Sequence, residues 1–252
     1  MSGYQTFKRY TNRLCGLLLV AAVAGCAEPQ IVSADAPDPF APVNRAVHQF
    51  NKGADTVLIR PLSKGYVTAV PGPLRRGISN GANNLAQPLY VANHLLQGDV
   101  EAAGTAFFRF GMNTTVGLAG LLDPATEAGL ADNPTDFGET LAVWGLPSGP
   151  YVELPILGPS TVRGTVGQVT EIVGDPLFFV IDDEFIAIPI AVEVGALLQT
   201  RQDFARVIDA LLYESADSYN ASRIAYLQNR ARELNEGLAL EELDLEDPFA
   251  FE

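Results

Sequence analysis

One short pattern in this sequence has the spacing of a catalytic nucleophile. Gly77-Ile78-Ser79-Asn80-Gly81 matches G-x-S-x-G, in which a serine stands on a sharp turn between a strand and a helix. That chemistry needs a buried strand before the serine, and an acid and a histidine after it. The segment from Pro71 to Arg76 does not have the pattern of a strand, and no acidic residue lies between Ser79 and His94. The motif therefore does not predict a hydrolase, and nothing else in the chain indicates an enzyme.

Ligands for a metal ion or a nucleotide are equally scarce. The two histidines, His48 and His94, are far apart, and the densest carboxylate group with apolar flanks is Asp182-Asp183-Glu184. Adjacent residues point in different directions, so three acids in a row make a poor metal cage and are typical of a solvated turn. The phosphate-binding pattern G-x-x-x-x-G-K-[ST] and the dinucleotide-binding pattern G-x-G-x-x-G do not occur. We expect no metal and no cofactor.

Cys26 has the clearest chemical role. It ends a stretch with the order of a secretory signal peptide: a basic start, an apolar run from Leu14 to Val23 that is too short to span a bilayer, and then small residues. Val23-Ala24-Gly25-Cys26 looks like a bacterial lipobox, in which the signal is cleaved before the cysteine and the cysteine is acylated. Each buried methylene contributes about 0.8 kcal/mol, and stable anchoring takes more than one chain. We predict a signal peptide over residues 1–25 and a lipidated tether over 26–37.

The residue after Cys26 indicates which membrane the protein is sorted to, and the net charge indicates which classes of partner to expect. Ala27 stands where an aspartate would be expected for inner-membrane retention, which by resemblance to sorting rules favours the outer membrane. The formal net charge of the 252 residues is −14, and removal of the three basic residues of the signal takes it to −17. Nucleic acid is therefore not an expected partner, since phosphate binding needs a basic surface. With 48% apolar and 18% charged residues, the chain can bury a sizeable core and still have apolar surface left over.

Most of the remaining sequence has the period of a helix face. Apolar residues recur at steps of three and four from Phe40 to Leu58, and this helix is expected to end at Arg60-Pro61, because the residue before a proline disfavours the helical conformation. Asp99 is expected to cap another helix. Further helices are expected over 74–85, from Pro88 in a first turn to a C-cap at Gly98, and over 162–173, 204–212 and 224–234, the last of these closed by Gly237.

Two segments differ from this helical pattern. Residues 111–158 are rich in glycine and too apolar for a free coil, which predicts a structured, turn-rich region in which short strands or a hairpin can form. Residues 185–198 carry Glu193 as their only charge, but they are too few to cross about 30 Å of hydrocarbon and are expected to lie in one leaflet or in a core. We take 38–236 as one helical domain and 237–252 as an acidic, disordered tail.

The polar faces of these helices leave their environment open. A helix that lies in a lipid interface usually carries Lys and Arg on its polar face, and these residues are scarce here. The periodicity therefore fits two arrangements equally well. The helices can bury their apolar faces in an ordinary core, or they can bury them in lipid and turn the polar faces inward to a water-filled path.

Short sequence motifs between Asp38 and about Arg230 resemble those of a known family. In chain order, these motifs are Asp38-Pro39-Phe40, Asn44-Arg45, Phe50-Asn51, Arg60-Pro61, Val70-Pro71, Asn84-Leu85, Leu95-Leu96-Gln97-Gly98, Arg109-Phe110, Asn113-Thr114-Thr115, Asp136-Phe137-Gly138, Trp144-Gly145, Gly149-Pro150-Tyr151, Leu154 to Ser160 and Tyr226-Leu227-Gln228. Together they resemble the MlaA family, also called VacJ, of outer-membrane lipoproteins. A dozen motifs in the same order make the resemblance highly specific, and the lipobox supports it independently.

The resemblance implies a fold, a function and partners. It implies a mainly α-helical, ring-shaped protein in the inner leaflet of the outer membrane, with an amphipathic channel through the ring. The implied function is removal of mislocalised phospholipid from the outer leaflet and its delivery to a periplasmic lipid-binding shuttle, with a trimeric porin as the usual partner. No cofactor and no covalent chemistry are implied. A structural or scaffolding lipoprotein without transport activity is the alternative.

A transport route needs groups that hold a charged headgroup while the acyl chains stay in the leaflet. We expect Arg45, Arg75 and Arg109 to contact headgroups, although each can instead form a structural ion pair. A hairpin within 117–138 is a candidate gate for the path. Two departures from the family stand out: Gly164 follows Arg163 where an aspartate is frequent, and Glu139 stands where glutamine is common.

Overall fold

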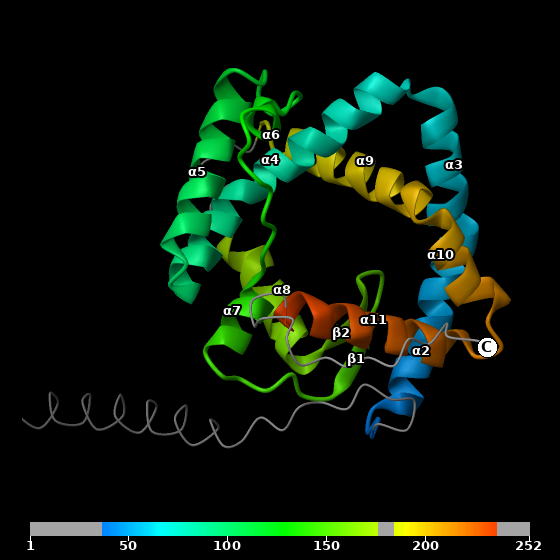
Figure 1. Ribbon diagram of the computed structural model, residues 1–252. Coiled ribbons are helices and arrows are strands. Elements are labelled where there is room, and N and C mark those ends of the chain that lie inside the picture. Colours follow the sequence, from blue (N-terminus) through cyan, green and yellow to red (C-terminus); the bar gives the residue numbers. More distant parts are fainter. Residues whose placement is uncertain (1–36, 176–183, 236–252) are drawn as a thin grey trace, which may run out of the picture.

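A computed structural model describes residues 37–175 and 184–235 of the chain. The predictions for the signal peptide, for Cys26, for Asp182 and Asp183 and for the acidic tail lie outside the described residues. Figure 1 shows the described helices arranged as a ring, which confirms the mainly helical, ring-shaped fold. The elements are α2 (Ala41–Ala54), η1 (Asp55–Ile59), α3 (Arg60–Ala69), α4 (Gly72–Gln97), α5 (Val100–Thr115), α6 (Pro124–Glu127), α7 (Phe137–Val143), β1 (Tyr151–Leu154), β2 (Gly158–Thr161), α8 (Val162–Gly174), α9 (Ala187–Asp203), α10 (Ala205–Asp209), η3 (Ala210–Glu214) and α11 (Ser218–Asn235).

α2, η1 and α3 form one continuous helical column. This column runs through Pro61, although a helix end was expected at Arg60-Pro61. α2 continues into a π-helical turn, η1, and then into α3, and Ile59 and Arg60 both keep right-handed helical angles. The Arg60 N–H bonds the Asp55 carbonyl, five residues back. A proline ring normally clashes with the carbonyl four residues before it, and the wider turn places Pro61 at the start of α3, where its missing N–H costs little. The expected stop at Arg60-Pro61 was therefore wrong.

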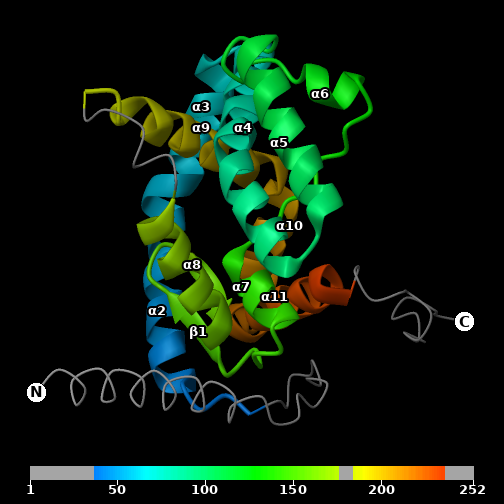
Figure 2. The ribbon, with the colours of Figure 1, turned by 90° about the vertical axis from the view of Figure 1, so that its left-hand side faces the viewer.

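α4 is one helix of 26 residues rather than two shorter ones. Pro88 lies inside it and not in the first turn of a new helix, so the expected break before Pro88 was wrong. α4 packs against both α5 and α9, and Figure 2 shows it between these two helices. Packing on both sides outweighs the cost of about 3 kcal/mol of an interior proline. The C-cap at Gly98 is confirmed by its left-handed φ of 83°, and the cap at Asp99 by its carboxylate, which accepts from Ala102 N at 2.9 Å.

The glycine-rich centre contains one hairpin, at its end. β1 and β2 pair antiparallel with Tyr151 opposite Thr161. Residues 117–138 contain turns and α6, and no strand, so the hairpin expected there as a gate is absent from that stretch. Gly120 shows why glycine is required in these turns. Its φ is 88°, and a Cβ atom there would lie 2.6 Å from the Asn84 Cβ.

The remaining helices complete the ring. α8 covers 162–174, as the valine spacing predicted, and begins at Thr161, whose hydroxyl accepts from Gly164 N. The apolar run that continues to Leu198 forms most of α9, which packs against α3 and α4. Among the described helices, none combines the length and the hydropathy needed to cross a membrane. α11 closes the ring beside the hairpin (Figure 1).

Candidate functional site

The described part of the chain has polar side chains inside and apolar side chains outside. Its buried residues include twenty polar or charged ones but only eight hydrophobic ones, five of them alanines, and 32 large hydrophobic residues are exposed. α2 and η1 illustrate the pattern: Asn44 and His48 are each 1% exposed, whereas Phe50 is 56% and Val57 79% exposed. Proteins surrounded by water show the opposite trend and rarely carry large apolar patches without a partner. The helices therefore turn their apolar faces outward, as the second of the two arrangements requires.

The first buried polar network joins α2, β1 and α11. His48 Nδ1 lies 2.9 Å from Glu153 Oε1, and His48 Nε2 lies 3.0 Å from Ser218 Oγ. Asn44 donates to the Tyr151 carbonyl and accepts from the Glu153 backbone N–H, so that one amide side chain pairs with the edge of the hairpin. These contacts satisfy groups that could not otherwise be buried.

Ser218, His48 and Glu153 have the order of contacts found in a serine hydrolase, but their surroundings differ. Ser218 is only 7% exposed, and the backbone N–H groups of the α11 first turn are occupied by the Asp217 carboxylate, which accepts from Asn220. A hydrolase needs free donors for the oxyanion and a path to the hydroxyl. We assign this trio a structural role. Ser79 lies within α4 rather than at a turn after a strand, so it forms no nucleophile elbow.

A second buried network ties η1 to the end of α9. Arg201 donates to both oxygens of Asp55, at 2.7 and 2.9 Å, and also to Asp209 at 2.7 Å. Burial alone would raise the pKa of Asp55, but hydrogen bonds from Arg201 and Tyr213 outweigh burial and lower it. The same hydrogen bond to Asp55 raises the pKa of Arg201. The pair fastens the column of α2 and α3 to the α9 side of the ring.

Arg109, one of the three expected headgroup contacts, is held inside the protein. It is 1% exposed, donates to Asp123 at 3.1 Å and to the Leu130 carbonyl at 2.6 Å, and also bonds Thr126. Burial tends to raise the pKa of Asp123, but hydrogen bonds from Thr126 and Asn113 outweigh burial and lower it. Arg109 thereby anchors the turns after α5.

Arg45, the second expected contact, lies on the surface but has partners. Its guanidinium bonds Asp217, with a closest approach of 3.2 Å, and stands 4.5 Å from the centre of the Tyr219 ring. The bond from Arg45 is the main cause of the lowered pKa of Asp217. Arg45 therefore connects α2 to the start of α11.

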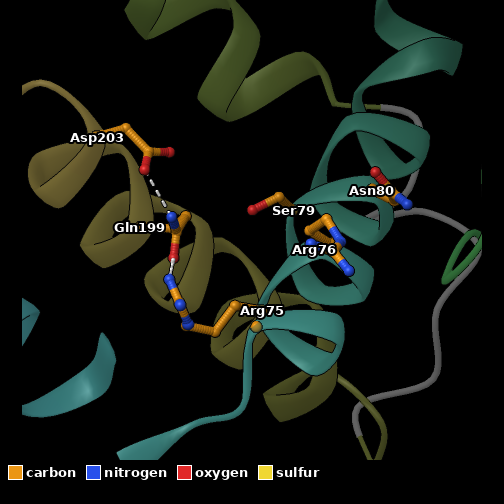
Figure 3. Close-up of a pocket in the computed structure, with 7 residues that line it drawn as sticks. Arg75, Arg76, Ser79, Asn80, Gln199 and Asp203 are labelled. Atoms are coloured by element: carbon orange, nitrogen blue, oxygen red, sulfur yellow. Dashed lines mark hydrogen bonds between the residues drawn. The ribbon is translucent and has the colours of Figure 1, made fainter. Parts of the chain in front are cut away.

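Arg75, the third expected contact, lines an open pocket. The pocket has a volume of about 300 Å³ and lies between the first turns of α4 and the end of α9; it is lined by Gly72, Arg75, Arg76, Ser79, Asn80, Gln199 and Asp203. Arg75 Nε donates to the Val70 carbonyl at 3.0 Å, and its Nη1 donates to Gln199 Oε1 at 2.7 Å. Figure 3 shows Arg75 reaching from α4 to Gln199, which in turn contacts Asp203.

Arg76, Gln199 and Asp203, which also line the pocket, were not expected from the sequence. Arg76 is exposed and has no hydrogen bond or ion pair with any residue in the described ranges. Its position next to Arg75 was a signal that could have found it. Gln199 and Asp203 carried no such signal, because they meet Arg75 only through the packing of α9 on α4.

The two departures from the family pattern have structural explanations. Arg163 is buried and bonds the Leu146 carbonyl at 2.7 Å. A Cβ atom at Gly164 would lie 2.9 Å from Ser160 Oγ and 3.3 Å from the Thr161 and Tyr226 hydroxyl oxygens, so an aspartate there would require these side chains to move. Glu139 accepts a hydrogen bond from the Thr135 hydroxyl at 2.7 Å, so its carboxylate has a partner four residues away in the chain. No group of three or more potential metal ligands occurs within 37–175 and 184–235.

Comparison with known proteins places the chain in a family. A family model described as MlaA lipoprotein matches residues 36–233. The chain belongs to the MlaA lipoprotein family. Among MlaA relatives, the intermembrane phospholipid transport system lipoprotein MlaA of Escherichia coli K12 is 33% identical over 228 residues, which cover 86% of each chain. The protein of the same name from Haemophilus influenzae is 31% identical and covers 90% of this chain and 92% of its own.

A solved MlaA-like structure supports the fold. It comes from work described as "Structural basis for maintenance of bacterial outer membrane lipid asymmetry", has a TM-score of 0.66 and 32% sequence identity, and covers 79% of this chain and 100% of its own. The relatives are named for a lipid transport system and not for an enzyme class. The family resemblance inferred from the short sequence motifs is therefore confirmed.

Proposed function

We propose that this protein is an outer-membrane lipoprotein that removes mislocalised phospholipid from the outer leaflet through an amphipathic path. The observation that carries the proposal is the reversed polarity of the ring, with 32 large hydrophobic residues exposed and charged groups such as Arg109 and Arg201 buried. A body of this kind gains free energy by placing its outer surface in hydrocarbon. Its polar interior offers a headgroup an alternative to crossing hydrocarbon. The names of the relatives support the same function.

The location and partners form part of the same proposal. Acylated Cys26 tethers the chain to the periplasmic face of the outer membrane, and the ring sits within the inner leaflet. The lipid passes to a periplasmic lipid-binding shuttle, and a trimeric porin holds the ring in place. No covalent step, cofactor or nucleic acid is involved. The competing function is a scaffolding lipoprotein, which would use the same anchor and the same apolar surface but move no lipid.

Among the three arginines, Arg75 has the strongest support as a headgroup contact. Its guanidinium lines a pocket beside the unpaired Arg76, whereas Arg45 is bonded to Asp217 and Arg109 to Asp123. A guanidinium group with a free Nη2, close to the positive charge of a second arginine, is suited to the oxygens of a phosphate. Arg45 and Arg109 stay predictions as headgroup contacts, and their contacts in the ring predict that replacing them lowers stability as well.

The test is the amount of phospholipid in the outer leaflet of cells. Cells without the protein are complemented with the wild-type chain, with Arg75→Ala or with a control, Arg206→Ala, which removes an exposed arginine on α10 outside the pocket. We expect outer-leaflet phospholipid to rise in the deletion strain and to stay raised with Arg75→Ala at normal protein level. Wild type and Arg206→Ala should restore it. Full restoration by Arg75→Ala would remove Arg75 from the route, and an unchanged deletion strain would favour a scaffold.

A further inference from the structure

The pocket at Arg75 carries charges of both signs on opposite walls. α4 contributes the guanidinium groups of Arg75 and Arg76, and α9 contributes the Asp203 carboxylate. The two walls are joined by Gln199, which accepts from Arg75 Nη1 at 2.7 Å and donates through Nε2 to Asp203 Oδ1 at 2.7 Å. Figure 3 shows this chain of contacts crossing from one helix to the other.

Several polar groups around this bridge remain available. Within the described residues, Arg76 and the Ser79 hydroxyl have no hydrogen bond, and the recorded bonds of Arg75 use Nε and Nη1 and leave Nη2 free. Asp203 is exposed and has only one oxygen bonded, so Oδ2 can accept from a ligand. Donors for an anion therefore face an acceptor for a cation across one cavity of about 300 Å³. That volume is at the lower end of the range for ligand pockets.

We infer that this pocket selects a zwitterionic headgroup that joins a phosphate to a primary amine, as in phosphoethanolamine. The phosphate oxygens accept from Arg75 Nη2, Arg76 adds a positive charge from the other side of the pocket, and the ammonium group donates to Asp203. Gln199 is a positioning residue that keeps the guanidinium and the carboxylate apart, since without it Arg75 and Asp203 would be free to pair with each other. A headgroup with phosphate and glycerol offers Asp203 no positive charge. This inference rests on the proposed function, and names the lipid class it favours.

The test compares two short-chain lipids. The full-length acylated protein in detergent is titrated calorimetrically with dihexanoyl phosphatidylethanolamine and with dihexanoyl phosphatidylglycerol, each below its micelle concentration. We expect the wild-type chain to bind the amine lipid about 1.5-fold to fivefold more tightly, the range that an exposed ion pair supplies. Asp203→Asn, which still accepts from Gln199, should abolish this preference by weakening only the amine lipid. Arg76→Ala should weaken both lipids.

A matched control removes a carboxylate elsewhere. Glu214→Gln on η3 loses the same charge from an exposed position outside the pocket and should keep the preference. Equal affinity of the wild-type chain for the two lipids, or equal weakening of both by Asp203→Asn, would overturn the inference. Binding of soluble phosphoethanolamine without binding of either lipid would show a site for a free metabolite and would also overturn it.

The same variants separate this inference from the proposed function. If cells that carry Asp203→Asn clear both lipid classes as the wild type does, while the deletion strain accumulates them, selection fails and transport stands. If the deletion strain accumulates neither lipid, while the purified chain still prefers the amine lipid, the proposed transport fails and the pocket stands.

Discussion

A chain without its acyl groups should remain bound to the membrane. The perturbation is a version that begins at Ala27 behind a signal peptide that is cleaved without lipidation. This design is sharper than Cys26→Ala, which can leave the apolar signal attached. A chain held only by its lipid anchor would be released into the aqueous fraction. A ring embedded in a leaflet would be retained by its own surface.

The magnitude follows from the exposed apolar residues. The 32 large hydrophobic side chains range from 41% exposed at Val162 to 79% at Val57. Full burial of such a side chain contributes about 1.5–3 kcal/mol, so burial of the exposed half contributes about 1 kcal/mol. If only ten of them enter hydrocarbon, the gain is about 10 kcal/mol, a partition ratio on the order of 10⁷. The acyl chains are then dispensable for retention.

The assay is the distribution of the chain between membrane and aqueous fractions without detergent. A second, acyl-free variant carries glutamates at exposed apolar positions of α5, α8 and α9: Phe107→Glu, Val166→Glu and Leu197→Glu. Each glutamate loses the apolar gain and adds a charge that hydrocarbon disfavours by up to about 3 kcal/mol, so this chain should be released. The control places glutamates at exposed positions beside polar residues: Asn133→Glu, Ala216→Glu and Gln228→Glu. Release of the unsubstituted acyl-free chain, or equal release of the two triple variants, would refute the reasoning.

Three further predictions concern the interior of the ring. Gly167→Ala on α8 places a Cβ atom 2.5 Å from a backbone nitrogen of α7 and should lower the free energy of unfolding in urea by about 1–3 kcal/mol. Gly104→Ala on α5 meets nothing within 4 Å and should be neutral or slightly stabilising; an equal loss for both would contradict the close packing. Asp55→Ala leaves buried Arg201 without its main partner and should cost about 3–5 kcal/mol in the same assay, so a loss below 1 kcal/mol would show that the pair is not buried in solution. Stability should also depend on pH. The pKa of Asp55 is lowered, so its contribution is present above about pH 4 and is lost as the pH falls further. The pKa of Glu171 is raised, chiefly by burial, so Glu171→Gln should remove a gain in stability seen as the wild type is taken from pH 7 to 5; an unchanged profile would contradict that assignment.

The sequence predicted the stripes of the helices but not the direction in which they face. Along α2, apolar residues at steps of three and four define a face, and the structure exposes that face while burying Asn44 and His48. The period of a helix is the same whether the apolar face meets a protein core or lipid, so periodicity left both open.

Local rules failed where tertiary structure opposes them. Pro61 and Pro88 indicated helix ends, yet the chain passes Pro61 through a π-helical turn and holds Pro88 inside α4 by packing on α5 and α9. The short sequence motifs predicted the family correctly, because a motif match depends on residue identity and not on local backbone conformation. In the candidate site, Arg75 could be named, whereas Gln199, which is 124 residues away, could not. Lipidation of Cys26 stays a prediction.

The most direct test of the central claim is the rate at which the cell clears phospholipid from its outer leaflet. A labelled phospholipid is loaded into the outer leaflet of living cells, and its disappearance from the surface is followed with a membrane-impermeant quencher. We predict rapid clearance with the wild-type chain, slow clearance in the deletion strain, and slow clearance with Arg75→Ala present in the membrane at normal level. Equal clearance with and without the protein would contradict transport through the ring.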